Sequence, residues 1–204
     1  MGNDITVRLE EPRDYHSVAL LTKAAFSSPE RIERAQIGCC PEHFMVHQLR
    51  QRDGIPALTF VAEQNGALVG HIIYSKAYIE RPDGTRLDVL NFGPLSVWPA
   101  HQKTGIGSAL MRHSIAEAKR LGYGAILFFG HPAYYPRFGF TEAKAFGITT
   151  ADGDNFPAFM AIELQEGYLQ NATGRFMESD IYDDDLNRAA AKAYDDQLMK
   201  ELLP

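Results

Sequence analysis

Two glycines separated by one residue, Gly105 and Gly107, lie between an apolar run (Leu90–Val97) and a segment expected to be a helix (Ser108–Leu121). At such a junction glycines let the backbone turn tightly, so that successive N–H groups point into one concavity. This concavity lies at the positive end of the helix dipole, which attracts anions. The spacing therefore predicts a site for a diphosphate.

The order of residues in this loop separates three kinds of phosphate-binding sequence. A Walker loop needs a lysine directly after its second glycine, but Lys103 precedes Gly105. A dinucleotide-binding fingerprint needs a third glycine, where this chain has Leu110. The pattern Gln/Arg-x-x-Gly-x-Gly/Ala remains, and it is filled by Gln102, Gly105 and Gly107. It resembles the coenzyme-A pyrophosphate loop of the GNAT superfamily of N-acetyltransferases.

A second motif, His131–Phe140, follows another apolar run, Ala125–Phe129. A later motif of the GNAT superfamily places a tyrosine five residues before the phenylalanine of a Gly-Phe pair, and this sequence is similar at Tyr135 and Phe140. Two motifs in the right order, with strand, helix and strand patterns between them, are more specific than either motif alone. The resemblance covers Ile5–Leu164.

The resemblance implies that acetyl-CoA is the co-substrate and is held by backbone groups. The N–H groups of Lys103–Ser108 would anchor the diphosphate, and the side chain of Gln102 would add hydrogen bonds. The pantetheine arm would pair with the splayed end of a strand, where Pro94 has no N–H to donate, and a backbone N–H there would polarise the thioester. An ordinary core strand over Phe92–Val97 is the alternative. The implied cofactor-binding residues are Leu95, Ser96, Val97, Gln102, Lys103, Thr104, Gly105, Ile106, Gly107 and Ser108.

Tyr135 matches the general acid of the superfamily, which protonates the departing thiolate of coenzyme A. A phenol, with a pKa near 10, is a suitable donor to an alkyl thiolate of similar basicity. Two alternatives stay open. Tyr135 packs as an aromatic beside Phe138 and Phe140, or a shift of one residue makes Tyr134 the acid. We expect Tyr135 to be catalytic and Tyr134 to line the substrate or to pack.

The base that accepts a proton from the attacking amine is not assigned. Some superfamily members carry a glutamate on the fifth strand, but the corresponding run here, Ile126–Phe129, has no carboxylate. His131 follows this run, and imidazole is a base near neutral pH, but capping or packing of the turn is the favoured alternative. Glu63 and His71 are weaker candidates.

No metal is expected. His43 and His47 lie four residues apart on an expected helix, but they lack both a third ligand and the glutamate that follows the first histidine in zinc-binding helices. A solvent-facing or acceptor-site role is favoured for both. Asp183–Asp185 is explained as the first turn of a helix, where carboxylates stabilise the helix dipole.

Composition favours a soluble enzyme. The 204 residues are 45% hydrophobic, enough for one substantial core, and no apolar run approaches the roughly 20 residues that span a bilayer. A formal net charge of −6 argues against nucleic-acid binding and slightly favours cationic substrates. Cys39 and Cys40 are adjacent and unsuited to a structural disulfide with each other, so we expect a cytoplasmic protein.

Periodicity and turn residues predict the elements that position these motifs. The expected strands are Ile5–Leu9, a hairpin about the turn Asn65-Gly66, Arg86–Val97, Ala125–Gly130, and a closing pair, Phe138–Ile148 and Phe156–Leu164. Helices are expected after Pro12 and from Pro41 to Arg52, with Ser27–Cys40 irregular. The strand after the phosphate loop's helix must be parallel to the strand before it, by the right-handed crossover rule.

These elements predict an α+β protein, and the resemblance implies the GNAT fold. Its sheet would be mixed, mostly antiparallel, of about six or seven strands flanked by helices. Residues 1–168 would form the acyltransferase domain and residues 169–204 a C-terminal extension with a terminal helix. A ridge on that helix needs a partner surface on the domain or on another subunit, so a homodimer is one outcome. Its members are Leu186, Ala190, Tyr194, Leu198 and Leu202.

Three functions compete. The first is an N-acetyltransferase that moves the acetyl group of acetyl-CoA directly to a primary amine on a small molecule or a protein. The second keeps the fold as a catalytically weak acyl-CoA sensor or partner-binding module, which the missing fifth-strand glutamate supports. The third, a nucleotide-binding domain, is disfavoured by the failed Walker and dinucleotide patterns. Phe146, Phe156 and Phe159 line an apolar acceptor slot or belong to the core.

Overall fold

The computed structural model describes residues 5–201, which divide into two compact units. The first unit comprises residues up to 73, residues 93–110 and the residues from 180 onward, and the second comprises residues 74–92 and 111–179. Strand β3 (Ala67–Glu80) runs from the first unit into the second. Within residues 5–201, no helix has the length and apolar character needed to cross a membrane.

The strands of the first unit include the predicted hairpin. Strand β1 (Ile5–Leu9) is antiparallel to β2 (Gly54–Gln64), which is hydrogen bonded to the first part of β3. Asn65 and Gly66 join β2 to β3 with φ angles of 53° and 78°, as a type I′ turn requires. A short strand, β5 (Ser96–Val97), pairs antiparallel with β3 on its other side.

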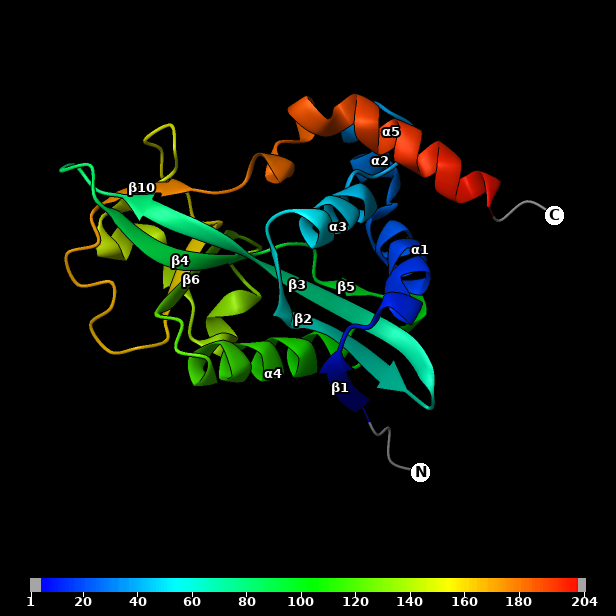
Figure 1. Cartoon of the computed structure of the whole chain (residues 1–204), viewed down its shortest axis with the longest axis horizontal. Coiled ribbons are helices and arrows are strands. Elements are labelled where there is room, and N and C mark those ends of the chain that lie inside the picture. The colour runs from blue at the N-terminus through cyan, green and yellow to red at the C-terminus, as the bar shows by residue number, and fades with distance from the viewer. Residues whose placement is uncertain (1–4, 202–204) are drawn as a thin grey trace. The chain divides into compact units, whose positions relative to one another are not determined.

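Four helices complete the first unit (Figure 1). They are α1 (Tyr15–Phe26), α2 (Pro29–Ala35), α3 (Glu42–Gln51) and α5 (Asp184–Lys200). Helices α1 and α3 share a core with strands β2 and β3, and its buried residues are Val18, Val46, Leu49, Val61, Ile73 and Ile181. The prediction that Ser27–Cys40 is irregular is wrong at α2, because Ser28 caps this helix by accepting a hydrogen bond from the N–H of Arg31 and Pro29 occupies its first position.

Helix α5 begins where the sequence predicts but buries only part of the predicted ridge, since Leu198 is buried and Ala190 is exposed. Asp183 caps it by accepting hydrogen bonds from the N–H groups of the second and third residues after it. The predicted ridge is wrong at Leu186, which is 65% exposed, and Leu202 lies outside the described residues. The buried positions are Ala191, Asp195 and Leu198. An α-helix has 3.6 residues per turn, so side chains spaced by exactly four residues wind gradually around the helix and do not all face the same neighbour. The buried face packs on α3 within the first unit.

A buried charge joins α5 to α1 and α3. The Asp195 carboxylate pairs with the Lys23 ammonium and lies 3.0 Å from the Nε2 of His43, whose side chain is fully buried. Burial lowers the pKa of His43, so this imidazole is neutral near pH 7 and Lys23 supplies the compensating charge. The pair therefore fixes the position of α5 by charge as well as by apolar contact.

Replacing Asp195 with Ala is expected to destabilise the first unit by about 2–3 kcal/mol, because Lys23 loses its partner in a mostly buried site. The loss falls below the range for fully buried pairs since the Lys23 side chain keeps 23% of its exposure. Urea unfolding followed by circular dichroism measures it. Asp196→Ala removes the neighbouring exposed carboxylate that pairs with Lys192 and serves as the control. An equal, small effect of both variants would contradict the prediction.

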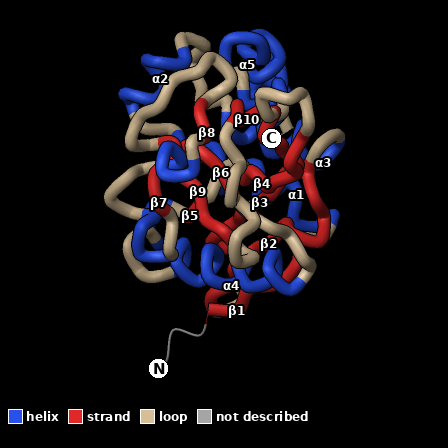
Figure 2. The backbone as a smooth tube through the Cα atoms, turned by 90° about the vertical axis from the view of Figure 1, so that its left-hand side faces the viewer, coloured by secondary structure: helices blue, strands red, loops and turns tan. Residues whose placement is uncertain are grey.

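The second unit continues the sheet from β3. Strand β4 (Arg86–Phe92) is antiparallel to β3, β6 (Ala125–Phe129) is parallel to β4, and β9 (Phe159–Glu163) is antiparallel to β6. Strand β7 (Thr141–Glu142) pairs with β9 at the edge. Strand β10 (Gly174–Met177) is antiparallel to β3 and parallel to β8 (Ile148–Thr149), which Figure 2 shows beside it.

The predicted strand Phe138–Ile148 is wrong over most of its length. It is broken into two 3₁₀ helices, η3 (Tyr135–Phe138) and η4 (Ala143–Phe146), and the short strands β7 and β8. Gly139 and Gly147 end these helices with φ angles of 96° and 72°, a left-handed conformation that interrupts a strand. The parallel pairing of β4 with β6 and the mixed, mostly antiparallel α+β sheet are confirmed. The division at residue 168 stays a prediction.

Candidate active site

Strand β4 stops pairing with β3 near Pro94, where the sequence predicts that the strand diverges from its neighbour. Tyr74 on β3 lies opposite Phe92, but His71 lies opposite Ser96, so the register shifts by one residue between the two pairs. An extra residue on one strand is a β-bulge, which bends the chain and leaves it partly unpaired. The interruption falls at Pro94 and the residue after it, since a proline has no N–H to donate. The predicted pantetheine-binding residues, Leu95, Ser96 and Val97, follow directly.

The phosphate loop runs from a 3₁₀ helix, η2 (Pro99–His101), to α4 (Ile106–Arg120). Lys103 and Gly105 have φ angles of 63° and 98°, so the backbone turns twice through the left-handed region before the helix begins. The Oγ1 of Thr104 donates a 2.6 Å hydrogen bond to the His101 carbonyl and holds this turn. The first N–H groups of an α-helix have no hydrogen-bond acceptors within the helix, so the start of α4 is suited to binding an anion.

Two contacts within the first unit tie this loop to the strands. The Nε2 of Gln102 donates a 3.2 Å hydrogen bond to the Val97 carbonyl, so the predicted diphosphate loop and β5 are brought together. Gly70 on β3 lets α4 approach closely, because a Cβ there would lie 2.8 Å from the Cγ2 of Ile106 and 2.9 Å from the Cδ1 of Leu110. The loop residues Gln102 to Gly105 are themselves exposed.

Tyr135 lies in an aromatic cluster of the second unit. Its ring centroid is 4.5 Å from that of Phe128 in an edge-on contact and 5.9 Å from that of Phe92. Gly130 makes room for this ring, since a Cβ there would lie 2.5 Å from the Cε2 of Tyr135. Burial raises the pKa of the Tyr135 hydroxyl, which keeps it protonated throughout the physiological range.

Tyr134 occupies a different environment. Its ring meets that of Tyr135 at right angles with centroids 5.0 Å apart, and the guanidinium of Arg137 lies 4.6 Å from its centroid. The ring of Tyr134 contacts Arg137 and Phe138 of η3, whereas the ring of Tyr135 contacts Phe128 on β6. This difference favours the register in which Tyr135 is the acid.

A carboxylate that the sequence does not single out lies beside β4 in the second unit. Glu178, directly after β10, accepts a 2.6 Å hydrogen bond from the Nδ2 of Asn91, which is 2% exposed. Burial raises the pKa of Glu178 to about 7, and the Asn91 hydrogen bond lowers it in part. No local pattern marks Glu178, because it follows the motif-bearing segment and its partner lies 87 residues away in sequence.

The three residues weighed as the base are engaged elsewhere. The Nδ1 of His131 accepts a hydrogen bond from the N–H of Ala133, which is the turn-capping alternative. Glu63 is ion paired with Arg8. His71 is fully buried 3.3 Å from a Glu10 carboxylate oxygen, and burial lowers its pKa.

The histidines and cysteines of the first unit form no metal site. His43 pairs with the Asp195 carboxylate, and the ring of His47 stacks on that of Tyr194 with centroids 4.7 Å apart. Burial raises the pKa of the Cys39 and Cys40 thiols to about 11, so both are protonated and unreactive. Among residues 5–201, no three His, Cys, Asp or Glu side chains are grouped to hold a metal ion.

The aromatic residues considered for an acceptor slot divide between surface and core. Phe159 is fully buried, and Phe146 packs against the core of the second unit. Phe156 is 43% exposed and stacks on Phe129, which is 41% exposed, with ring centroids 5.6 Å apart. Phe129 and Phe156 therefore form an accessible apolar surface at the end of β6.

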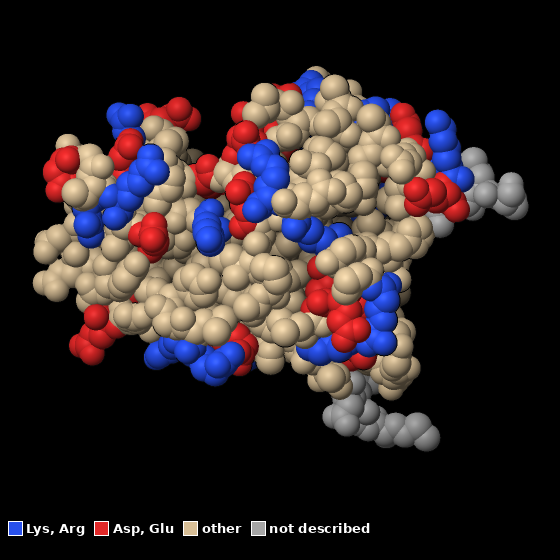
Figure 3. Space-filling model, in the orientation of Figure 1, with Lys and Arg blue, Asp and Glu red and all other residues tan. Residues whose placement is uncertain are grey.

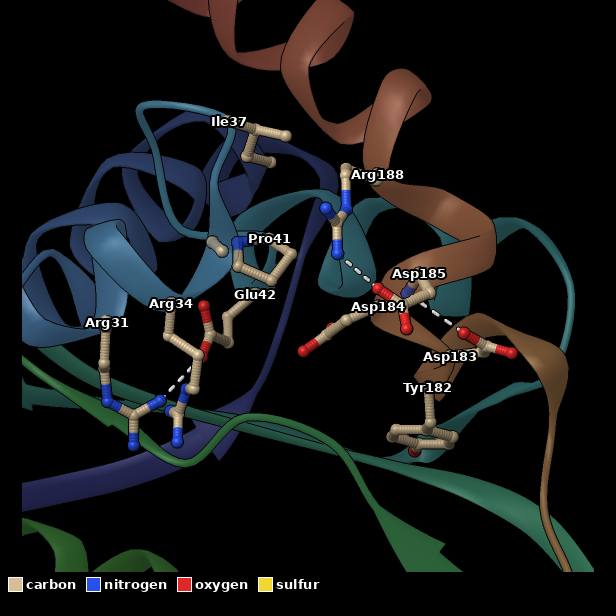
Figure 4. A pocket seen from close by; sticks show the side chains of 11 residues that line it. Arg31, Arg34, Ile37, Pro41, Glu42, Tyr182, Asp183, Asp184, Asp185 and Arg188 are labelled. Carbon is tan, nitrogen blue, oxygen red and sulfur yellow. Dashed lines mark hydrogen bonds and ion pairs between the residues drawn. The ribbon is translucent and has the colours of Figure 1, made fainter.

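A cavity of about 390 Å³ lies between α2 and the start of α5 (Figure 4). Two ion pairs lie among the residues that line it, Arg31 with Glu42 and Arg188 with Asp185. Figure 3 shows basic and acidic side chains next to each other on the visible face near the beginning of α5. None of the predicted site residues lines this cavity, whose lining residues are Arg31, Arg34, Ala35, Ile37, Pro41, Glu42, Tyr182, Asp183, Asp184, Asp185 and Arg188.

Comparison with known proteins shows which families and structures the chain resembles. Residues 56–142 match the model of the acetyltransferase (GNAT) domain. The chain is 32% identical over 120 residues to the uncharacterized N-acetyltransferase YjhQ of Escherichia coli, covering 58% of this chain and 65%, just under two thirds, of that protein. It is 26% identical over 169 residues to YhbS of the same organism, covering 82% of this chain and 92% of YhbS.

Solved structures agree. YhbS from E. coli, in complex with CoA, superposes with a TM-score of 0.76 at 23% identity and covers 90% of this chain and 94% of its own. A GNAT family acetyltransferase from Brucella melitensis, in complex with acetyl-CoA, has a TM-score of 0.66 at 25% identity, with 89% and 99% covered. The predicted fold is confirmed, and the matches agree with the predicted superfamily and enzyme class. The chain is therefore similar to the GNAT N-acetyltransferases over residues 56–142 and in its fold.

Proposed function

We propose that this protein transfers the acetyl group of acetyl-CoA directly to a primary amine. The observation that carries the proposal is the loop Gln102–Ser108, which turns through two left-handed residues into the start of α4 and is hydrogen bonded to β5. Backbone N–H groups at a helix start suit the diphosphate of coenzyme A. The E. coli and Brucella structures of the same fold contain CoA and acetyl-CoA, which supports the choice of co-substrate.

Each part of the cofactor has residues that suit it. Lys103 to Ser108 would bind the diphosphate through the backbone, with Gln102 exchanging its bond to Val97 for one to a phosphate oxygen. The edge of β5 that faces away from β3, together with Leu95 before it, would then bind the pantetheine amides as a further strand would. A backbone N–H at this bulge is a fixed dipole that would stabilise charge on the thioester oxygen.

Tyr135 would protonate the leaving thiolate. Its hydroxyl carries a proton at all physiological pH values, because burial raises its pKa. Partial donation to sulfur as the C–S bond breaks stabilises the transition state without requiring a free phenolate. Direct transfer needs no cysteine nucleophile, which agrees with the buried, protonated state of Cys39 and Cys40.

The acceptor is an amine-bearing small molecule or protein. A scaffold of conserved fold carries its specificity in its loops, so the fold alone does not select among metabolites, polyamines, antibiotics and protein termini. The exposed pair Phe129 and Phe156 favours an acceptor with an apolar portion.

Turnover of acetyl-CoA with a panel of primary amines tests the proposal. We expect release of free coenzyme A, measured with a thiol reagent, together with an acetylated amine identified by mass spectrometry. The panel contains alkyl and arylalkyl amines, polyamines, aminoglycosides and peptides with free N-termini. Binding of coenzyme A by calorimetry without turnover on any amine would favour the acyl-CoA sensor, and binding of ATP or NAD in preference to coenzyme A would favour a nucleotide-binding domain.

A further inference from the structure

Glu178 and Tyr135 lie beside consecutive residues of one strand. Asn91 on β4 donates a 2.6 Å hydrogen bond to the Glu178 carboxylate. The next residue, Phe92, is in ring contact with Tyr135 at 5.9 Å between centroids. The carboxylate and the phenol are thus both held at the end of β4, immediately before the chain leaves the ladder.

The two groups lie on opposite faces of the sheet. Side chains of consecutive strand residues point to opposite faces. Phe92 faces α4, because its cross-strand partner Tyr74 is hydrogen bonded to Ser114 on that helix at 2.9 Å. Asn91 therefore points to the other face, where it meets Glu178. The end of β4 thus presents a carboxylate on one face and a phenol on the other, and β4 stops pairing with β3 directly after both.

Within residues 5–201, the neighbouring strands present uncharged side chains to Glu178. The side chains that β3, β4 and β6 present on this face of the second unit are Ser75, Ala77, Val89 and Leu127. None of them ionises near neutral pH, and β10 contributes Phe176 to the same cluster. Burial rather than a charged neighbour therefore sets the proton affinity of this carboxyl group, with Asn91 as its hydrogen-bond partner.

We propose that Glu178 is the general base of the reaction and that Asn91 is a positioning residue that orients it. This inference rests on the proposed acetyl transfer. The Glu178 carboxylate takes one proton from the amine nitrogen as that nitrogen forms a bond to the acetyl carbon. The C–S bond breaks, and the sulfur takes one proton from the Tyr135 hydroxyl. Exchange with water returns the proton from Glu178 to Tyr135, so the products are the amide and free coenzyme A.

The dependence of kcat/KM on pH for the amine tests this role. Below about pH 7, where the base becomes protonated, the wild type should lose a further factor of ten in kcat/KM per pH unit, in addition to the loss from protonation of the amine. Glu178→Gln should lower kcat/KM at neutral pH by about 10²–10⁴-fold and abolish this limb. Ionisation of the free amine produces a second limb near the pKa of an alkyl ammonium, about 10, which the variant retains.

Three variants make the result specific. Glu178→Asp keeps a carboxylate, so it should retain a limb and part of the activity even if Glu178→Gln folds poorly. Asn91→Ala should move the limb to higher pH, because the hydrogen bond that it removes lowers the pKa of Glu178. Glu166→Gln changes an exposed glutamate outside the site and should match the wild type.

The outcomes separate this inference from the proposed function. An inactive wild type on every amine would overturn the acetyl transfer and the base together. An active wild type with a Glu178→Gln variant that keeps the limb near pH 7 would overturn the base alone. A variant that loses activity equally at all pH values, with its limb unmoved, would show a structural role for Glu178 and would also overturn the proposal.

Discussion

Replacing Tyr135 with Phe is expected to lower kcat by about 10²–10⁴-fold, the usual contribution of a general acid, when the chemical step limits turnover. The hydroxyl acts on charge that develops at sulfur in the transition state, so the affinity for acetyl-CoA should stay nearly unchanged. The ring contacts with Phe92 and Phe128 do not involve the hydroxyl, so the cluster should remain folded. Steady-state kinetics and calorimetric titration of acetyl-CoA measure the two effects.

Tyr134→Phe is the matched control, because it removes the same atom from the adjacent residue. The ring of Tyr134 stacks on Arg137, and the proposed mechanism does not use its hydroxyl in proton transfer. The Tyr134→Phe variant should therefore retain most activity. Loss of activity in Tyr134→Phe with retention in Tyr135→Phe would assign the acid to Tyr134. Retention in both variants would mean that solvent or the acceptor protonates the thiolate.

Local sequence patterns predict the cofactor side of the site well. Glycine spacing, a proline that cannot donate and a strand-to-helix junction are properties of contiguous residues, and their backbone requirements are the same in any context. The left-handed φ of Gly105 and the register shift around Pro94 appear where the sequence places the turn and the splay. The hairpin at Asn65 and Gly66 was predictable for the same reason.

Other parts of the structure depend on contacts between distant residues. The buried face of α5 is set by Lys23 and His43 on other helices, and an i+4 row does not contain that information. Glu178 is one of 26 acidic residues, and only its bond to Asn91 separates it from the rest. The break of Phe138–Ile148 follows from two left-handed glycines, which an alternating apolar pattern conceals. Pairing over long separations is what a single sequence does not display.

Replacing Gly107 with Val is expected to weaken binding of acetyl-CoA by at least tenfold. Gly107 lies in the first turn of α4, where N–H groups without acceptors in the helix are available to an anion. The diphosphate needs several of these groups at once, so the backbone must approach it closely, and a branched side chain on this turn holds it away. Isothermal titration calorimetry on the folded variant measures the loss.

Ala116→Val supplies the matched control for this last change. It introduces the same β-branched residue into the same helix at an exposed position away from the start of the helix. Because Ala→Val lowers helix propensity whereas Gly→Val does not, the control is at least as demanding on the helix. Its affinity for acetyl-CoA should equal that of the wild type. A Gly107→Val protein that folds, shown by circular dichroism, and binds acetyl-CoA as tightly as Ala116→Val would disprove the assignment of this loop to the diphosphate. A loss confined to Gly107→Val would locate the diphosphate at the start of α4, because Ala116→Val carries the same side chain on the same helix away from its start.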